Sequence, residues 1–371
     1  MVIMKYKTIL FLSVYVFLWP VLINAQPYER SSEETHTFKV FEPTSLEVYN
    51  KYGNIHLFPW EKDSVKIRIE LNVKANKVSK VDKIFEYINF EFSNTKYYII
   101  ARTELKQHGS FWSEVSDLAN TLFSGNNKAQ IDYYIYMPKD MPAKFENKFG
   151  NIYSTDHSGK LEVSISNGDY KANNIDGFLE LDLSFGNASI NSIETGKLNI
   201  NYGELELKKA NDLTLKSKSS TFHIEEVESL LVISKRDKFK IDNIKSLTGE
   251  TSFSYISLKD FTSDLSLKTS YGEVKLEDIN PNFKVIDLTS NYTDIVLTIP
   301  EQASFGLDIT HSGSTGIIYE EKFESIKTEI IDEKEDIKKT SGIIGGNSNP
   351  GRNIKIMTKS GTITFKKFIS K

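Results

Sequence analysis

Apolar residues recur along most of this chain with a period of 17 or 18 residues, and they alternate with polar residues inside each period. A small residue, often preceded by an aromatic one, marks the register and is taken as position zero. The register runs through Gly150, Gly168, Gly186, Gly203, Ser220, Asp237, Ser254 and Gly272. Gly53 fits the same pattern, and looser matches follow at Thr293, Gly313 and Gly361.

The apolar positions keep their place relative to zero from one period to the next. Two residues after zero the chain carries, among others, Leu205, Phe222, Phe239, Ile256 and Val274. Four residues after zero it carries, among others, Leu207, Ile224, Ile241, Leu258 and Leu276. Further apolar columns lie seven after and five before zero, and the residues between them are mostly polar. Such period-two alternation predicts strands with one buried face.

One period cannot bury its own apolar residues, but coils stacked about 4.8 Å apart would align them in continuous columns. We therefore predict an all-β, single-chain β-solenoid with coils of 17 or 18 residues. Each coil would hold two short strands that meet at position zero, where the chain bends, and a third turn at position seven. The predicted repeat turns are Gly53, Gly150, Gly168, Gly186, Gly203, Gly272 and Gly361. The predicted solenoid core includes Leu205, Leu207, Ile224, Ile241, Ile256, Leu258, Val274 and Leu276.

The register is interrupted after the first coil, which lies near residues 44–60. Apolar spacing predicts a small α+β elaboration at about residues 61–137. Its expected strands lie near 65–71, 90–104 and 131–137, and its expected helices near 78–88 and 111–123. We expect this elaboration to cap the open end of the solenoid. A lid over a ligand site is the alternative.

A second interruption lies at about residues 320–352. It contains a charged run at 329–339 and a glycine-rich stretch at 345–351, which together predict a flexible loop. The apolar residues from Ile354 to Phe365, with Gly361 at position zero, are expected to complete the final coil. The whole of residues 26–371 is therefore predicted to be one solenoid domain.

Short motifs accompany the repeats: Ile135-Tyr136-Met137-Pro138-Lys139, Asn147-Lys148-Phe149-Gly150-Asn151-Ile152, the Asn-Tyr-Gly and Ser-Tyr-Gly turns at 201–203 and 270–272, and Lys359-Ser360-Gly361-Thr362-Ile363. On these residues the chain resembles the bacterial putative-adhesin family of β-strand repeat proteins, and the related head domain of putative autotransporter adhesins. The likeness covers most of residues 40–367. It implies a signal peptide, an envelope location and no catalytic residues, and it bears on architecture more than on activity.

The first 25 residues have the pattern of a cleavable signal peptide. Lys5 and Lys7 precede a short apolar run from Ile9 to Trp19, and Ala25 offers a cleavage site before Gln26. The apolar run is shorter than the roughly 20 residues that span a bilayer, so cleavage is favoured over a retained anchor. We expect an exported bacterial protein, located in the periplasm, on the outer surface or in the medium.

Composition removes several kinds of chemistry. The chain has no cysteine, which excludes disulfides, thiolate metal sites and cysteine nucleophiles. Loss of residues 1–25 would remove two lysines and change the net charge from −4 to −6, so nucleic acid is not an expected partner. The six histidines show no metal-ligand spacing. We therefore expect no metal and no cofactor.

Paired carboxylates provide the strongest case for an enzyme, because solenoids can carry acids and bases of glycosidases on an outer face. The candidate outward acids are Glu204, Glu206, Glu225, Asp242, Asp260, Glu273 and Glu277. They are interleaved with lysines, as expected for a solvated face of mixed charge. This pattern favours a non-enzyme.

An aromatic residue often stands directly before position zero, as in Phe149, Phe185, Tyr202, Phe253, Tyr271 and Tyr292. Counted by strand alternation this column points inward, which predicts core packing. If it faced solvent, it would form an aromatic row suited to sugar rings.

Three functions are compatible with these patterns. We favour a structural, adhesin-like or binding module whose partner is an envelope protein or a glycan. The alternatives are a polysaccharide lyase or glycosidase, and a periplasmic scaffold or sensor subunit with a protein partner. An acidic pair in a groove would favour the enzyme, an exposed aromatic row glycan binding, and a large apolar patch a protein partner.

Overall fold

The computed structural model describes residues 27–105, 128–319, 325–347 and 350–368. The signal peptide expected at 1–25 and the helix expected near 111–123 lie outside the described residues. One helix, α2, spans Val78–Tyr87. The strands of the described residues are β1 (Tyr28–Lys39), β2 (Ser45–Lys51), β3 (Ile55–Pro59), β4 (Ser64–Ala75), β5 (Ile88–Asn94), β6 (Tyr98–Leu105), β7 (Lys128–Met137), β8 (Ala143–Lys148), β9 (Ile152–Ser154), β10 (Leu161–Ser166), β11 (Tyr170–Ser184), β12 (Asn187–Asn201), β13 (Glu204–Lys218), β14 (Thr221–Lys235), β15 (Lys238–Ser252), β16 (Tyr255–Ile279), β17 (Val285–Pro300), β18 (Phe305–Ser312), β19 (Gly316–Tyr319), β20 (Lys327–Asp332), β21 (Ile337–Ile344), β22 (Asn353–Thr358) and β23 (Thr362–Phe368).

The chain forms two compact units. The described part of the smaller unit comprises residues 27–31, 72–87 and 128–129, and the larger unit comprises the rest. In the smaller unit α2 buries Val81 and Ile84. Arg30 pairs with Asp82 at 3.1 Å, and its guanidinium lies 4.4 Å from the centre of the Phe85 ring.

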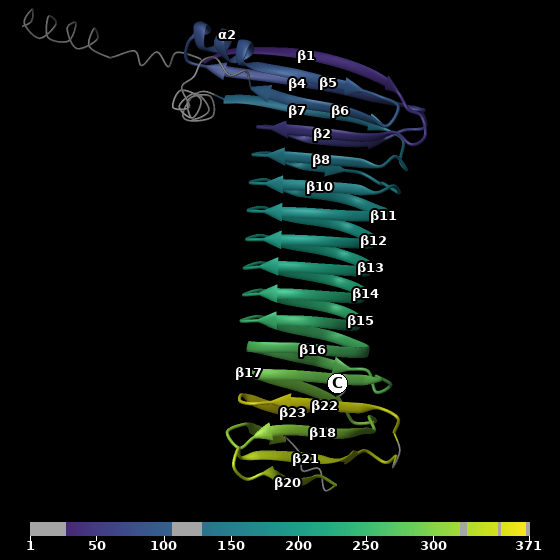
Figure 1. The fold of residues 1–371 in the computed structure, drawn as a ribbon, viewed down its shortest axis with the longest axis vertical. Coiled ribbons are helices and arrows are strands. Elements are labelled where there is room, and N and C mark those ends of the chain that lie inside the picture. Colours follow the sequence, from purple (N-terminus) through teal and green to yellow (C-terminus); the bar gives the residue numbers. More distant parts are fainter. Residues whose placement is uncertain (1–26, 106–127, 320–324, 348–349, 369–371) are drawn as a thin grey trace, which may run out of the picture. The chain divides into compact units, whose positions relative to one another are not determined.

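The larger unit is a β-solenoid, which confirms the predicted fold class. Strands β10 to β16 each pair in parallel with the next, and equivalent residues face each other across coils, as in Leu198↔Leu215 and Leu215↔Val232. Figure 1 shows these strands stacked in chain order. Each of β11 to β15 is one 15-residue strand, where two short ones were expected, because the pairing continues around the bend seven residues after zero.

Alternate side chains of every coil point into the solenoid. The eight residues assigned to the core from sequence are at most 3% exposed: Leu205, Leu207, Ile224, Ile241, Ile256, Leu258, Val274 and Leu276. Burial of each such side chain stabilises the fold by about 1.5–3 kcal/mol. Stacked columns of these residues therefore hold the coils together.

The glycines at position zero are needed for a different reason from the one expected. The bend falls on the preceding residue, which has a left-handed φ of 53° to 64° from Tyr52 through Tyr292. Glycine follows because the backbones of successive coils nearly touch. A Cβ on Gly186 would lie 1.9 Å from the carbonyl oxygen of Gly168, and one on Gly150 would lie 1.8 Å from that of Gly53. The equivalent distances for Gly53, Gly168, Gly203, Gly272 and Gly361 are 2.0 to 2.2 Å.

Asparagine and aspartate directly after zero cap the neighbouring coil. The Oδ1 atom of Asn151 accepts the backbone N–H of Asp169 at 2.8 Å, and Oδ1 of Asp169 accepts that of Asn187 at 2.9 Å. These side chains satisfy amides at the turn that strand pairing does not reach. Sequence reasoning treated them only as turn formers.

The last coil in sequence is not the last in space. Strand β22 pairs in parallel with both β17 and β18, and β23 pairs with β17 and β19. The yellow β22 and β23 accordingly lie between β17 and β18 in Figure 1. The expectation that residues 354–365 complete the end of the solenoid is therefore wrong. The outer edge of β18 is instead covered by β21, which runs antiparallel to it and pairs with β20.

The coil of β2 and β3 is likewise internal to the larger unit. Strand β2 pairs with β6 on one side and β8 on the other, and β3 pairs with β7 and β9 in the same way. The elaboration at 61–137 thus supplies a further coil through β6 and β7. Strand β5 then covers β6 in antiparallel pairing.

Candidate functional site

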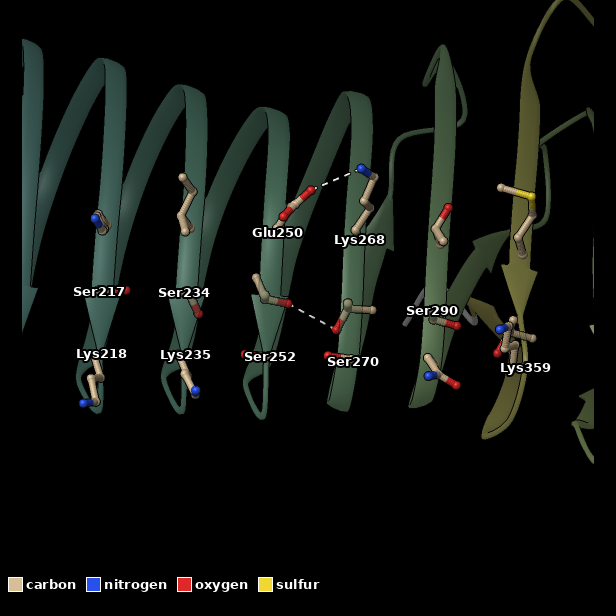
Figure 2. Close-up of a pocket in the computed structure, with 18 of the residues that line it drawn as sticks. Ser217, Lys218, Ser234, Lys235, Glu250, Ser252, Lys268, Ser270, Ser290 and Lys359 are labelled. Carbon is tan, nitrogen blue, oxygen red and sulfur yellow. Dashed lines mark hydrogen bonds and ion pairs between the residues drawn. The ribbon is translucent and has the colours of Figure 1, made fainter.

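A groove of about 940 Å³ runs across the ends of the strands that precede the tight turn, from β12 to β18, with β21 and β22 contributing. We call it the axial groove, because its lining residues lie in rows that cross successive coils (Figure 2). Three rows form most of the lining. The outer row, four residues before zero, holds Lys216, Ile233, Glu250, Lys268, Thr289 and Met357. The middle row, three residues before zero, holds Ser217, Ser234, Thr251, Thr269, Ser290 and Thr358. The third row, two residues before zero, holds Lys218, Lys235, Ser252, Ser270, Asn291 and Lys359.

The middle row is a column of hydroxyl groups that lies inward and is only 4% to 7% exposed. The same column is apolar in earlier coils, where it holds Leu183 and Ile200. Hydroxyls in this column bond within the core: Thr251 Oγ1 donates to Thr269 Oγ1 at 3.1 Å. Ser290 Oγ is buried and has no hydrogen-bond partner among the described residues. The change from apolar to hydroxyl side chains coincides with the start of the groove.

Asp237 anchors the polar layer beneath the groove. It is fully buried and replaces glycine at position zero. Its carboxylate accepts hydrogen bonds from Ser217 Oγ at 2.8 Å, from the Ser220 N–H at 2.7 Å and from the Lys235 N–H at 3.0 Å. Burial raises the pKa of Asp237, and these hydrogen bonds oppose that rise without cancelling it. Asp237 therefore fixes the backbone from which Lys235 projects.

The outward rows make the groove electropositive. Five lysines line it, and Glu250 is the one carboxylate among the described lining residues. Glu250 pairs with Lys268 at 3.1 Å, a contact drawn as a dashed line in Figure 2. Asn291 Oδ1 also lines the groove and is buried without a hydrogen-bond partner among the described residues. The lining thus offers positive charge to a bound molecule.

An exposed row of aromatic rings lies beside the groove. Each ring belongs to the residue directly before position zero, next to the row that holds Lys218 and Lys235. We call these rings the aromatic ladder: Tyr52, Phe149, Phe185, Tyr202, Phe253, Tyr271 and Tyr292. From Phe149 to Tyr292 its members are 44% to 59% exposed. The prediction that this column packs in the core is wrong. A left-handed residue interrupts strand alternation, so the side chain turns outward although the parity count placed it inside.

Neighbouring rings of the ladder stack face to face. Phe185 and Tyr202 have centroids 5.0 Å apart, and Phe253, Tyr271 and Tyr292 form a triple stack with separations of 4.8 and 5.1 Å. Each left-handed aromatic costs roughly 1–2 kcal/mol in backbone energy. Each stacked pair returns about 0.5–1.5 kcal/mol. The stacks therefore offset much of the strain of the turn.

Polar residues interrupt the ladder beside the middle of the groove. Ser219 and Arg236 take the left-handed position between Tyr202 and Phe253. The Arg236 guanidinium lies 5.9 Å from the centre of the Phe253 ring, and Lys218 Nζ lies 5.7 Å from that of Tyr202. This gap leaves one face of each flanking ring without an aromatic neighbour and places a cation near each.

The carboxylates proposed as enzyme candidates gather elsewhere. Glu206, Glu225 and Asp242 line a second pocket of about 490 Å³ together with Lys208 and Lys240. Opposite charges alternate there, as the sequence indicates. Glu277 hydrogen-bonds Lys275 at 2.8 Å, and that contact lowers its pKa, which favours its ionised form and not a proton-donating one.

The histidines do not form a site with metal-ligand geometry within the described residues, where no cluster of three metal-binding side chains occurs. His223 is exposed, and His56 stacks between Tyr134 and Tyr153 at 4.9 Å from each. His157 is 1% exposed and fills the inward column seven after zero. Burial lowers its pKa to about 4. It is a neutral core residue at physiological pH.

The single described helix is too short and too polar to cross a membrane. No protein-family model matches the chain, and the search of curated proteins found no match.

Three solved structures are similar to this chain at low identity. A putative cell adhesion protein from Clostridium sporogenes is 11% identical, with a TM-score of 0.22 over 91% of this chain and 100% of that one. A putative adhesin from Parabacteroides merdae is 12% identical, with a TM-score of 0.44 over 67% and 96%. A putative adhesin from Bacteroides fragilis is 11% identical, with a TM-score of 0.25 over 91% and 97%. Function is therefore inferred from the side chains of this chain.

Proposed function

We propose that this chain is an exported, non-catalytic and adhesin-like module of a bacterial envelope, and that it holds a carbohydrate chain along the axial groove. One observation carries the proposal: rows of mostly polar side chains, with hydroxyl, amide or ammonium groups, cross successive coils beside the exposed aromatic ladder. Equivalent side chains recur about every 4.8 Å along the stack. A polymer lying in the groove would therefore meet a side chain at this spacing in each coil, and most of these side chains are polar.

The chemistry of the lining suits sugars. Hydroxyls of Ser252 and Ser270 face the groove and can both donate and accept hydrogen bonds to sugar hydroxyls. Asn291 adds a side-chain amide to the same row. Polar groups of this kind, placed beside apolar ring surface, are the usual means of orienting a ligand.

A carbohydrate-cleaving function is the weaker alternative. A glycosidase uses two carboxyl groups that flank the scissile bond. The axial groove offers Glu250 as its one carboxylate among the described lining residues, and Lys268 holds it in an ion pair. Turnover of a defined polysaccharide would overturn the non-catalytic assignment.

A glycan array probed with the full chain tests the proposal, followed by titration of each bound glycan. Ser252→Trp places an indole in the groove and is expected to abolish binding. Ser229→Trp is the matched control, because Ser229 is exposed on β14 and does not line the groove. Equal binding by both variants would refute the groove as the site. Pull-down from envelope extract with the same two variants would reveal a protein partner instead.

A further inference from the structure

The axial groove carries an excess of positive charge in a protein whose net charge is −4. Its five lysines face one carboxylate, which leaves a local charge of +4. Arg236, in the adjoining gap of the ladder, adds another exposed cation. A concentration of one sign of charge in a hollow, against the sign of the whole molecule, attracts ligands of the opposite sign.

Some lysines elsewhere on the solenoid form ion pairs with acids on a neighbouring coil. Lys209 pairs with Glu226 at 3.0 Å, and Lys245 pairs with Glu228 at 3.4 Å. Others, such as Lys171 and Lys238, form no ion pair with any described residue. The groove differs in gathering several cations: Lys218, Lys235 and Lys359 are exposed there and form no ion pair with any described residue. Figure 2 shows these three ammonium-bearing side chains in one row at the strand ends. Their charges are left for a bound molecule.

Two buried oxygens belong to residues of the groove wall. Ser290 Oγ and Asn291 Oδ1 belong to the groove lining and have no hydrogen-bond partner among the described residues. Because both atoms are buried, they lie behind the surface that a bound molecule would touch. The exposed lysines and hydroxyls of the outward rows are the groups available to it.

We propose that the axial groove selects an acidic polysaccharide, one with carboxylate or sulfate groups repeated along the chain; this inference rests on the proposed carbohydrate-binding function. The lysine row holds the anionic groups, and the serine and asparagine side chains hold the sugar hydroxyls. The gap at Ser219 and Arg236 receives a sugar ring beside Tyr202 and Phe253, which have no aromatic neighbour on that side. A nucleic acid is less well matched, because most ladder rings stack on each other and leave few faces for bases.

Pairs of polymers with the same sugar backbone, one charged and one neutral, test whether the acidic groups contribute to binding. Dextran sulfate is compared with dextran, and polygalacturonate with its methyl ester, by titration against the full chain. We expect the acidic member of at least one pair to bind at least tenfold more tightly than its neutral counterpart, and the pair that responds identifies sulfate or carboxylate. Affinity should fall as salt rises.

Charge variants locate the binding surface. Lys218→Gln combined with Lys235→Gln should weaken binding of the acidic polymer about tenfold. Lys209→Gln combined with Lys245→Gln changes the net charge equally outside the groove and should leave binding unchanged. Both pairs lie on exposed positions, and equal melting temperatures will show that neither disturbs the fold.

The outcomes separate the two proposals. Equal binding of neutral and acidic polymers would overturn the acidic preference and leave carbohydrate binding intact. Absence of binding to every polymer and to the glycan array would overturn both. Equal loss of binding in the two double variants would show non-specific attraction and refute the groove. Displacement of the polysaccharide by single-stranded DNA at equal charge concentration would refute selection for sugars.

Discussion

His157 makes the solenoid sensitive to acid, and the size of the effect follows from its burial. The ordinary pKa of histidine is about 6.5, whereas burial lowers that of His157 to about 4 in the folded protein. Below pH 6.5 the unfolded chain takes up a proton that the folded chain does not. The stability that neutral His157 contributes is therefore complete above about pH 6.5 and is lost as the pH falls toward 4. A difference of about 2.5 pKa units corresponds to roughly 3 kcal/mol.

His157→Ile isolates this contribution, because isoleucine occupies the same column in the next coils at Ile175 and Ile193. The substitution leaves the Lys160 carbonyl oxygen bonded to the Ala143 N–H. We expect similar free energies of unfolding for variant and wild type at pH 7.5, and a variant more stable by about 3 kcal/mol at pH 4.

Urea unfolding followed by circular dichroism from pH 4 to 8 measures the difference. Ile175→Val is the control, since its loss of about 0.5–1.5 kcal/mol should not depend on pH. Parallel stability curves for wild type and His157→Ile over the whole pH range would refute the reasoning.

Three further predictions concern the stack itself, and each is measured by chemical unfolding. Leu207→Ala should cost about 2–5 kcal/mol because it opens a cavity in a buried column, whereas Glu206→Gln on the opposite face should be nearly silent. Gly186→Ala should cost at least about 3 kcal/mol, since its Cβ would lie 1.9 Å from a carbonyl oxygen; Gly346→Ala, which meets nothing within 4 Å, should be neutral, and equal effects would contradict the close-approach explanation. Asp237→Asn should cost about 1–3 kcal/mol because one donor loses its acceptor beneath the groove, and an unchanged midpoint would show that the carboxylate is dispensable.

The period of the chain was sufficient to predict the solenoid, because the inward columns depend only on residue spacing. Leu207, Ile224 and Ile241 occupy the same position in successive coils, and neighbouring coils pair them directly. Hydrophobic alternation expresses that relation in sequence. It holds as long as the backbone remains extended.

The aromatic ladder was misplaced because alternation fails at a left-handed residue. Phe253 was counted as inward, yet it is 48% exposed with a φ of 55°. Asn167 occupies the same column, and asparagine is one of the few residues that tolerate this conformation readily. That substitution was a usable signal for the turn, and it was not recognised.

The axial groove and the order of the last coils depend on how different coils compare and pair, which the sequence of one repeat does not show. The replacement of Ile200 by Ser217 and Ser234 in one column was visible in the sequence and could have indicated a polar layer. Nothing in the apolar pattern of residues 354–365 distinguishes an internal coil from a terminal one. The pairing is seen only in space, where Asp294 Oδ1 accepts the N–H of Thr362 at 2.9 Å.

Insertion of β22 and β23 between earlier strands makes this part of the solenoid depend on a segment that follows those strands in the chain. Until residues 353–368 arrive, β17 and β18 each present a row of unpaired amide and carbonyl groups across an open slot. A molecule truncated before residue 353 would keep two unpaired strand edges, on β17 and β18, that can pair with a strand of another molecule. Residues 353–368 therefore protect two strand edges at once.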